Sequence, residues 1–235
     1  MSQLQRITIN PSQLQENQLL LTPQQQHYLL RVLRSRDGDK FIAMDGISKW
    51  WLAQLIGEQG QILEPLEVTT ELPVSITLMV ALPKGNGCDD IVRCSTELGV
   101  TCILPILSDR TLLKPSPQKL ERWRRIALEA AEQSERAFVP TILEPVAFST
   151  AINECVSLHR YICEARGNYP HLTTVSNKFS SEIIITIGPE GGWTDQELEI
   201  AIKSGFQPIS LGRRILRAVT APIVALSLIA AACEV

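Results

Sequence analysis

The chain has 235 residues, of which 45% are hydrophobic and 20% are charged, and its formal net charge at pH 7 is −3. A chain of this length can bury a large core, in either one or two domains. The near balance of 22 basic and 25 acidic residues excludes a protein that coats nucleic acid by charge alone, so a site for an anionic partner must concentrate its cations locally.

The sequence predicts neither a membrane anchor nor a metal site. Its longest apolar run, Ala221–Cys233, is broken by Ser227 and is shorter than the roughly 20 residues that span a bilayer. Residues 1–11 lack the basic start and the apolar stretch of a secretory signal, which favours a cytoplasmic location. The six cysteines show no CxxC or Cys/His spacing, so we expect reduced, mostly buried thiols.

Residues 1–72 are predicted to form a small β-barrel that carries one helix. The helix starts after Thr22, a good N-cap residue, with Pro23 in its first turn. The Asp45-Gly46 pair tolerates positive φ and therefore favours a hairpin turn. The predicted strands are Phe41–Met44, Lys49–Ile56 and Gln61–Thr69. The prolines and acidic residues that follow predict a linker near residue 72.

Residues 73–235 show the pattern of an α/β domain with a parallel sheet, because continuous apolar runs alternate with amphipathic helices. The predicted strands are Ile76–Leu82, Cys102–Leu107, Arg160–Cys163, Glu182–Ile187 and Pro208–Leu211. The predicted helices are Asp89–Leu98, a long helix after Ser116, one between Thr194 and Gly205, and a last helix that begins near Thr220. The last helix is apolar almost all round, so it must be buried in a core or against a second subunit.

The most informative segment is IIITIGPEGGW, residues Ile183–Trp193. An apolar strand runs into three glycines within five residues, and a capped helix follows at Thr194. Glycines let backbone approach a ligand closely, and the helix N-terminus offers unpaired N–H groups. We interpret this segment as a ligand-binding loop at the carboxyl end of a strand. The alternative is a tight turn that needs glycine only for its positive φ.

A second segment, ISLGRRILRAVTAP at Ile209–Pro222, again runs from a strand to a glycine, and then adds arginines before the apolar last helix. Basic side chains beside a buried helix are costly to place unless they reach an anion. Among them Arg217 is the best candidate for a ligand contact, and the alternative is a salt bridge to Glu190 or another carboxylate. Further basic groups, each equally compatible with a solvated surface, are Arg31, Arg34 and Arg36, and Arg122, Arg124 and Arg125.

A third, weaker segment is AAEQSERAFVP, where Gln133, Ser134 and Arg136 gather at the end of the long helix. They are placed either to contact a substrate or simply to solvate the helix end. Other chemistries find no support, because the chain has no GxxxxGK[ST], and Asp90 stands where GxGxxG needs its last glycine. Its three histidines occur in no HExxH and beside no GxSxG.

Four motifs in order resemble one family. They are KGNGCDDIVRCSTELGV (Lys84–Val100), EQSER (Glu132–Arg136), IGPEGGW (Ile187–Trp193) and LGRRILRAVTAP (Leu211–Pro222), and HYLLRVLRSRDGD (His27–Asp39) extends the match. They are similar to the RsmE family within the SPOUT superfamily, whose members are RNA methyltransferases that modify uridine N3 in small-subunit ribosomal RNA.

The resemblance implies an RNA-binding barrel similar to a PUA domain at residues 1–72, and at residues 73–235 a SPOUT α/β domain with a C-terminal trefoil knot. It also implies a homodimer, 16S ribosomal RNA or the small subunit as partner, and S-adenosylmethionine as cofactor. The implied cofactor-binding residues are Ile187, Gly188, Pro189, Glu190, Gly191, Gly192, Leu211, Gly212, Ile215, Leu216, Arg217 and Ala221.

Catalysis would require the removal of the N3 proton from an unpaired or flipped uridine. Our hypothesis is that Arg217 or Arg136 stabilises charge on the base carbonyls while Glu190 or water accepts the proton. One departure bears on this hypothesis. Where family members often read LRTETA, this chain has Ala218 and Val219, so a hydroxyl and a carboxylate are missing.

Two alternatives stay open. One is another SPOUT activity, such as 2′-O-ribose or guanine-N1 methylation. The other is a non-catalytic RNA-binding factor of ribosome assembly, which the departure at Ala218 and Val219 would suit.

Overall fold

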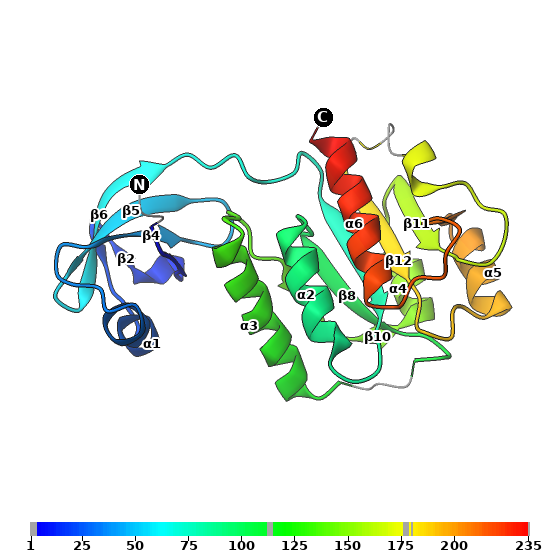
Figure 1. Cartoon of the computed structure of the whole chain (residues 1–235), viewed down its shortest axis with the longest axis horizontal. Coiled ribbons are helices and arrows are strands. Elements are labelled where there is room, and N and C mark those ends of the chain that lie inside the picture. Colours follow the sequence, from blue (N-terminus) through cyan, green and yellow to red (C-terminus); the bar gives the residue numbers. More distant parts are fainter. Residues whose placement is uncertain (1–3, 112–114, 176–178, 180, 235) are drawn as a thin grey trace. The chain divides into compact units, whose positions relative to one another are not determined.

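The computed structural model describes residues 4–111, 115–175, 179 and 181–234. The chain forms two compact units. The first unit comprises Met1–Glu71 and Ala131–Val139, and the second comprises Leu72–Ala130 and Pro140–Val235. Figure 1 shows the elements of each unit in the order of the chain.

The first unit is built on a curled six-stranded sheet with the strand order β1-β4-β5-β6-β3-β2. Its strands are β1 (Arg6–Thr8), β2 (Leu14–Gln15), β3 (Gln18–Leu19), β4 (Lys40–Met44), β5 (Trp50–Ile56) and β6 (Gln59–Leu66). The β1–β4 pair is parallel, and the other pairs are antiparallel. A short 3-10 helix, η1 (Pro11–Gln13), follows β1. The three predicted strands are confirmed as β4, β5 and β6, whereas β1, β2 and β3 are too short to show a period in the sequence.

Local sequence explains the turn and the helix of this unit. The Asp45 carboxylate accepts hydrogen bonds from the backbone N–H groups of Ile47, Ser48 and Lys49, each at 2.9 Å, and Gly46 has a φ of +71°. This is the predicted hairpin turn between β4 and β5. The predicted helix is α1 (Pro23–His27), which continues as the π-helical turn η2 (Tyr28–Val32). Thr22 caps α1 as expected, by accepting a hydrogen bond from the backbone N–H of Gln25.

The segment that follows the long helix also belongs to the first unit. Ala131 and Ala137 pack in one cluster with Ile42, Met44 and Trp50. The chain can turn back here because Glu135 adopts a left-handed conformation, with a φ of +61°. No sequence pattern separates residues 131–139 from the C-terminal part. The boundary at residue 72 stays a prediction.

The second unit contains a seven-stranded sheet in which all described pairs are parallel. The order is β10-β8-β7-β12-β11-β13, and β9 pairs with β8. The strands are β7 (Ile76–Ala81), β8 (Cys102–Leu107), β9 (Thr141–Ile142), β10 (Val146–Ala147), β11 (His159–Cys163), β12 (Ile183–Ile187) and β13 (Gln207–Ile209). The five predicted strands are therefore confirmed as β7, β8, β11, β12 and β13.

Helices follow most of these strands. They are α2 (Gly87–Glu97), α3 (Pro117–Gln133), α4 (Phe148–Glu154), α5 (Asp195–Lys203) and α6 (Thr220–Cys233), with the 3-10 helix η3 (Leu172–Thr174) after β11. Figure 1 shows α2 and α6 side by side in front of the strands, and α4 contacts α5. The sequence did not predict α4, whose N-cap, Ala147, offers no side chain to signal a helix start.

The core of the second unit follows the alternation of side chains along its strands. Met79, Ile106 and Ile184 of the sheet pack in one hydrophobic cluster with Phe148 of α4 and Ala201 of α5. No helix in the described part of the chain has the length and apolarity needed to cross a bilayer.

The cysteines differ in part from the expectation. All six are free. Cys88 is buried, and burial raises its pKa to about 12, but the other five are partly exposed. The prediction of mostly buried thiols is therefore wrong. Two of the partly exposed cysteines, Cys102 and Cys163, are the first residue of β8 and the last residue of β11, and desolvation raises the pKa of both thiols.

Candidate cofactor-binding site

A cavity of about 490 Å³ lies in the second unit, just beyond the carboxyl ends of β7, β11 and β12. Four segments line it: Pro83 and Lys84 after β7, residues 163–166 at the end of β11, the loop after β12, and residues 211–221 before α6. Ligands of open α/β sheets bind at this edge. The volume lies in the range of about 300–1,000 Å³ that is usual for small-molecule sites.

The loop after β12, residues 188–193, is called the glycine loop below. It includes Gly188, over which the indole ring of Trp193 is packed so closely that a Cβ at Gly188 would lie 3.0 Å from the ring. Gly192 has a φ of +71°, a conformation that favours glycine. Gly192 therefore needs glycine for its turn, as the alternative interpretation expects, and Gly188 needs it for the packing of Trp193. The interpretation as a ligand-binding loop stays a prediction.

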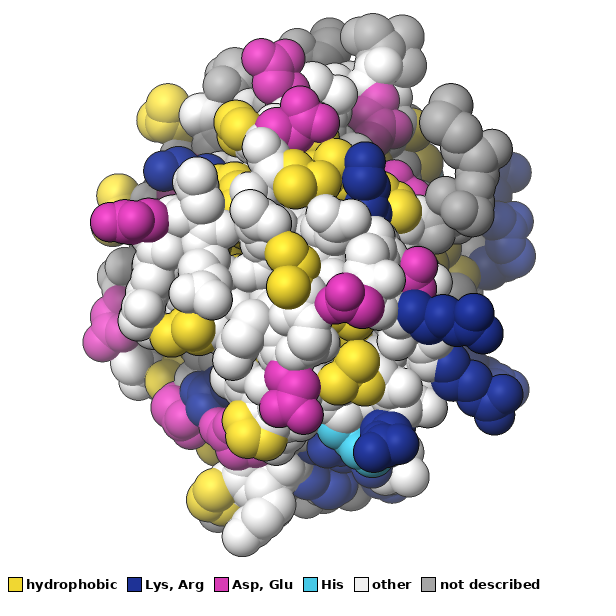
Figure 2. Space-filling view, turned by 90° about the vertical axis from the view of Figure 1, so that its left-hand side faces the viewer, with side chains coloured by type: hydrophobic (Ala, Val, Ile, Leu, Met, Phe, Trp, Pro, Cys, Tyr) yellow, Lys and Arg dark blue, Asp and Glu magenta, His cyan; other side chains and the backbone are white. Residues whose placement is uncertain are grey.

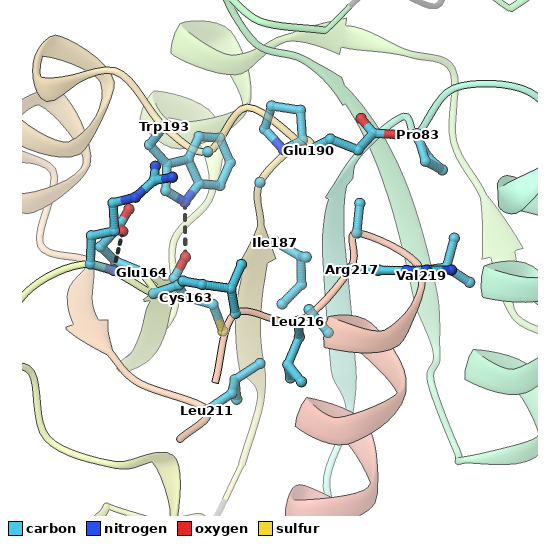
Figure 3. A pocket seen from close by; sticks show the side chains of 18 of the residues that line it. Pro83, Cys163, Glu164, Ile187, Glu190, Trp193, Leu211, Leu216, Arg217 and Val219 are labelled. Carbon is cyan, nitrogen blue, oxygen red and sulfur yellow. Dashed lines mark hydrogen bonds between the residues drawn. The ribbon is translucent and has the colours of Figure 1, made fainter. Parts of the chain in front are cut away.

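Neighbouring strands hold the glycine loop in place. Trp193 Nε1 donates a hydrogen bond of 3.0 Å to the carbonyl of Cys163 at the end of β11, and its ring contacts Phe148 with a centroid distance of 4.9 Å. From the other side, the backbone N–H of Lys84 after β7 donates to Glu190 Oε1 at 2.9 Å. Figure 3 shows the bond to Cys163 and the Glu190 side chain extending toward Pro83.

The segment 211–221 forms the opposite wall. Gly212 has a φ of +122°, a conformation that favours glycine, and a Cβ at this position would meet no atom within 4 Å. The Gly212 N–H donates to Ser210 Oγ at 3.1 Å. The carbonyl of Arg217 accepts from Thr220 and Ala221, and this turn leads directly into α6.

The cavity combines an apolar interior with a basic rim. Ile187, Leu211 and Leu216 lie around it between the glycine loop and the start of α6 (Figure 3). Arg214 and Arg217 line it as well, and both are exposed. The described residues offer the Arg217 side chain no ion pair, so the predicted alternative of a salt bridge to Glu190 is not found.

The two residues that depart from the family pattern both line the cavity. Ala218 is buried, and Val219 packs against α2 so closely that a Cβ at Gly87 would lie 2.7 Å from Val219 Cγ2. At this position the chain has an apolar contact between α2 and the segment before α6, where the LRTETA pattern of the resemblance would place a carboxylate.

The structure brings most of the predicted site residues together. Eleven of the twelve predicted cofactor-binding residues line the cavity: Ile187, Gly188, Pro189, Glu190, Gly192, Leu211, Gly212, Ile215, Leu216, Arg217 and Ala221. Gly191 is absent from that lining because its carbonyl points to Arg110 instead. Sequence reasoning missed Pro83, Lys84, Cys163, Glu164 and Arg166. Cys163 ends a predicted strand and the other four residues follow predicted strands, so the rule that ligands bind at the carboxyl ends of parallel strands could have found them.

Arg136 is not part of this cavity. It lies in the first unit, where its side chain is 3% exposed and its Nη2 donates to Glu71 Oε2 at 2.6 Å. Glu71 Oε1 also accepts from the backbone N–H of Phe138. Within the chain, Arg136 therefore ties the segment after α3 to the end of the first unit.

The two other groups of arginines named from the sequence lie at residues 122–125 and 31–36. Arg122 is paired with Asp89 at 2.7 Å, and Arg124 with Glu144 at 3.3 Å, as expected for a solvated helix face. Arg31, Arg34 and Arg36 are exposed. Figure 2 looks at the side of the molecule that lies on the left in Figure 1. Near the lower edge of this view, Lys and Arg side chains gather around a histidine. No cluster of three His, Cys, Asp or Glu side chains suited to a metal ion occurs within the described ranges.

Two models of known protein families match the chain, one in its C-terminal part and one in its N-terminal part. Residues 70–230 match the RNA methyltransferase domain, and residues 21–64 match the RNA methyltransferase PUA domain. The first match covers the cavity and all strands of the second unit. The second covers α1, β4, β5 and most of β6.

Curated relatives and solved structures agree with these matches. Ribosomal RNA small subunit methyltransferase E of Synechocystis sp. is 47% identical over 97% of this chain and 78% of its own length, and that of Bacillus subtilis is 30% identical over 89% and 88%. The crystal structure of the Neisseria gonorrhoeae enzyme of that name, bound to S-adenosyl methionine, superposes with a TM-score of 0.87 at 32% identity, covering 96% of both chains. The resemblance found in the motifs is thereby confirmed, together with the PUA-like and SPOUT-type α/β fold. The chain belongs to the ribosomal RNA small subunit methyltransferase E family.

Proposed function

We propose that the chain is an S-adenosylmethionine-dependent methyltransferase that modifies N3 of a specific uridine in 16S ribosomal RNA. The observation that carries the proposal is that the glycine loop and residues 211–221, which α5 and β13 separate in the chain, line a single cavity. Family membership supports the same chemistry, since relatives are named as ribosomal RNA methyltransferases and the gonococcal structure holds S-adenosyl methionine.

The residues around the cavity fit this cofactor. Ile187, Leu211 and Leu216 offer apolar surface to an adenine ring, and the glycines let backbone N–H and C=O groups approach a ribose or an amino acid group. The twelve predicted residues remain our assignment for cofactor binding, with Gly191 acting through its backbone rather than by lining the cavity.

When bound, S-adenosylmethionine supplies an activated methyl group on its sulfonium. The protein then has to align uridine N3 with that methyl group and take up its proton. In our proposal, the Arg217 guanidinium, on the rim of the cavity, stabilises negative charge that develops on the base carbonyls. Glu190 or water accepts the proton. Lys84 N–H holds Glu190 Oε1, which orients the carboxylate beside the cavity.

The predicted catalytic role of Arg136 stays a hypothesis. Its side chain is bound to Glu71 in the first unit. For Arg136 to contact a uridine it would have to exchange this partner for the substrate, in its own subunit or in a second one. Arg217 needs no such exchange, so we assign the main catalytic contribution to Arg217.

The identity of the methylated product tests the proposed function. Small subunits purified from a strain that lacks the gene, incubated with the protein and S-adenosylmethionine, are expected to gain 3-methyluridine in 16S ribosomal RNA. Mass spectrometry of the nucleosides measures it. Appearance of a 2′-O-methylated nucleoside or 1-methylguanosine instead would show another SPOUT activity. The proposal includes action in the cytoplasm, where such subunits are assembled.

A non-catalytic assembly factor is the second candidate, and Ala218 and Val219 are the observation that favours it. Such a factor need not bind a methyl donor. Titration calorimetry with S-adenosylmethionine separates the two, because the proposed enzyme must bind it and an inert factor has no reason to. The intact cavity wall formed by residues 211–221 favours the enzyme.

We further propose that the chain acts as a homodimer through α6. One face of this helix, with Ala225, Leu226 and Ile229, is buried in the second unit, while Val224 and Leu228 stay half-buried. A half-exposed apolar face on a helix indicates a partner surface. Light scattering is expected to give a dimer for the wild type and a monomer for Leu228→Glu, with Lys203→Glu, an exposed change on α5, as control. A monomeric wild type would contradict this proposal.

A further inference from the structure

The glycine loop is also held by a strand that is not its neighbour in the sheet. β8 is separated from β12 by β7, yet the turn after β8, residues 108–111, reaches the loop that follows β12. This turn is itself fixed, because Thr111 Oγ1 accepts from Ser108 N–H at 3.1 Å and the Thr111 N–H donates to the Ser108 carbonyl at 2.9 Å. These hydrogen bonds hold the turn that carries Asp109 and Arg110, the two residues that contact the glycine loop and α5.

Arg110 forms the first half of the contact. Its Nη1 donates to the carbonyl of Gly191 at 2.7 Å and to the carbonyl of Trp193 at 3.1 Å. The arginine stem lies so close to the loop that a Cβ at Gly191 would be 3.0 Å from Arg110 Cδ. One guanidinium nitrogen thus bridges two carbonyls on either side of Gly192, the residue with positive φ.

Glu197 forms the second half. It is 4% exposed and occupies the third position of α5. Its Oε1 accepts from the backbone N–H of Asp109 at 2.9 Å, and its Oε2 accepts from the backbone N–H of Thr194 at 2.8 Å. A single buried carboxylate therefore joins the turn after β8 to the residue that directly follows the glycine loop.

We propose that Arg110 and Glu197 form a clamp that holds the glycine loop in the conformation that binds the cofactor. Neither residue lines the cavity, so both are positioning residues that act through the backbone of Gly191, Trp193 and Thr194. The inference rests on the proposed function, because it names what prepares the same site. Charge-assisted hydrogen bonds are the strong ones, and a loop rich in glycine loses more freedom on ordering than other segments. A clamp that orders it beforehand removes that cost from cofactor binding.

The variants that test the clamp are Arg110→Ala and Arg110→Lys. Lysine keeps the charge and one contact but cannot reproduce the planar guanidinium, so its effect should be intermediate. Arg125→Ala is the matched control, because Arg125 is 70% exposed and has only a 3.9 Å ion pair with Glu129 on α3. Glu197→Gln removes an acceptor from the other half of the clamp, since an amide offers only one oxygen.

Calorimetry with S-adenosylmethionine is expected to show a dissociation constant about tenfold higher for Arg110→Ala, about threefold higher for Arg110→Lys and unchanged for Arg125→Ala. Hydrogen exchange should be faster in the peptide that covers residues 187–196 of Arg110→Ala, and unchanged in peptides from α2. A structural role alone would accelerate exchange throughout the second unit and leave the dissociation constant of the folded protein unchanged.

Wild-type affinity in Arg110→Ala would overturn the clamp, and so would uniformly faster exchange across the second unit. A wild-type protein that binds no S-adenosylmethionine would refute the proposed function instead. Even then the exchange rates of residues 187–196 would still decide whether Arg110 orders the loop.

Discussion

Replacing Arg217 by alanine is expected to lower kcat about 100- to 1,000-fold, while the dissociation constant for S-adenosylmethionine changes much less. The reason is the position of this side chain. Arg217 lines the rim of the cavity, and the described residues provide no carboxylate partner for it. Its charge is therefore free to meet negative charge that forms on the uracil carbonyls as N3 loses its proton.

Arg213→Ala is the control for this prediction, because Arg213 lies on the same segment and is exposed but does not line the cavity. Single-turnover methylation of small subunits at saturating S-adenosylmethionine measures the rate, and calorimetry measures the affinity. If kcat and cofactor affinity of Arg217→Ala fell by the same factor, Arg217 would act through cofactor binding alone, and its catalytic role would be refuted. If Arg213→Ala lowered kcat equally, the loss of a positive charge rather than the position of Arg217 would explain the slower methylation.

Replacing Trp193 by alanine is expected to lower the free energy of unfolding of the second unit by about 3–5 kcal/mol. The side chain is 7% exposed and belongs to the cluster formed with Phe148 of α4 and Phe206 after α5. Removal of the indole leaves a cavity there and deprives Gly188 of the ring that packs on it. Cofactor binding should weaken as well, because the same residue lines the cavity.

The Trp193→Phe variant separates packing from hydrogen bonding. Phenylalanine keeps most of the buried ring but cannot donate to the Cys163 carbonyl, so a smaller loss of about 1–2 kcal/mol is expected. The slowest exchanging amides of β12 report the opening free energy of the second unit. If the β12 amides of Trp193→Ala and of the wild type exchanged at the same rate, the packing of the indole ring would not stabilise the second unit.

The sequence was informative where one segment carries its own signal. Ile183–Ile187 is a continuous apolar run that ends at three glycines, and that pattern predicted both β12 and the glycine loop. Arginines and a glycine before an apolar helix likewise indicated the wall at residues 211–221. Both predictions depend on local chemistry, namely the glycine conformations and the burial of a strand on both faces.

The rest depends on contacts that no local pattern encodes. Arg110 comes after a strand that is not adjacent to β12, so its bond to Gly191 could not be inferred from spacing. Residues 131–139 belong to the first unit although α3 runs to Gln133, and no local pattern marks the left-handed Glu135 that follows this helix. Glu164 and Arg166 differ from these cases, because they follow a predicted strand and the rule that ligands bind at the carboxyl ends of parallel strands could have found them. The trefoil knot, inferred only from the resemblance, stays a prediction.

The departure at Ala218 and Val219 has a definite structural consequence. Val219 fills space against Gly87 at the start of α2, so an apolar contact occupies the place where the LRTETA pattern of the resemblance would put a carboxylate. In the proposed mechanism, proton removal from the substrate is assigned to Glu190, whose Oε1 is held by Lys84 N–H, or to water. The same proposal assigns to Arg217 the stabilisation of charge on the base while the proton leaves.

The most direct test is a crystal structure of the protein grown with S-adenosylmethionine. We expect the adenosyl group of the methyl donor between Ile187 and Leu216, enclosed by the backbone of the glycine loop and by residues 211–221. Crystals in which the donor occupies another part of the chain, or in which these two segments have separated and hold nothing at a saturating concentration, would contradict the account.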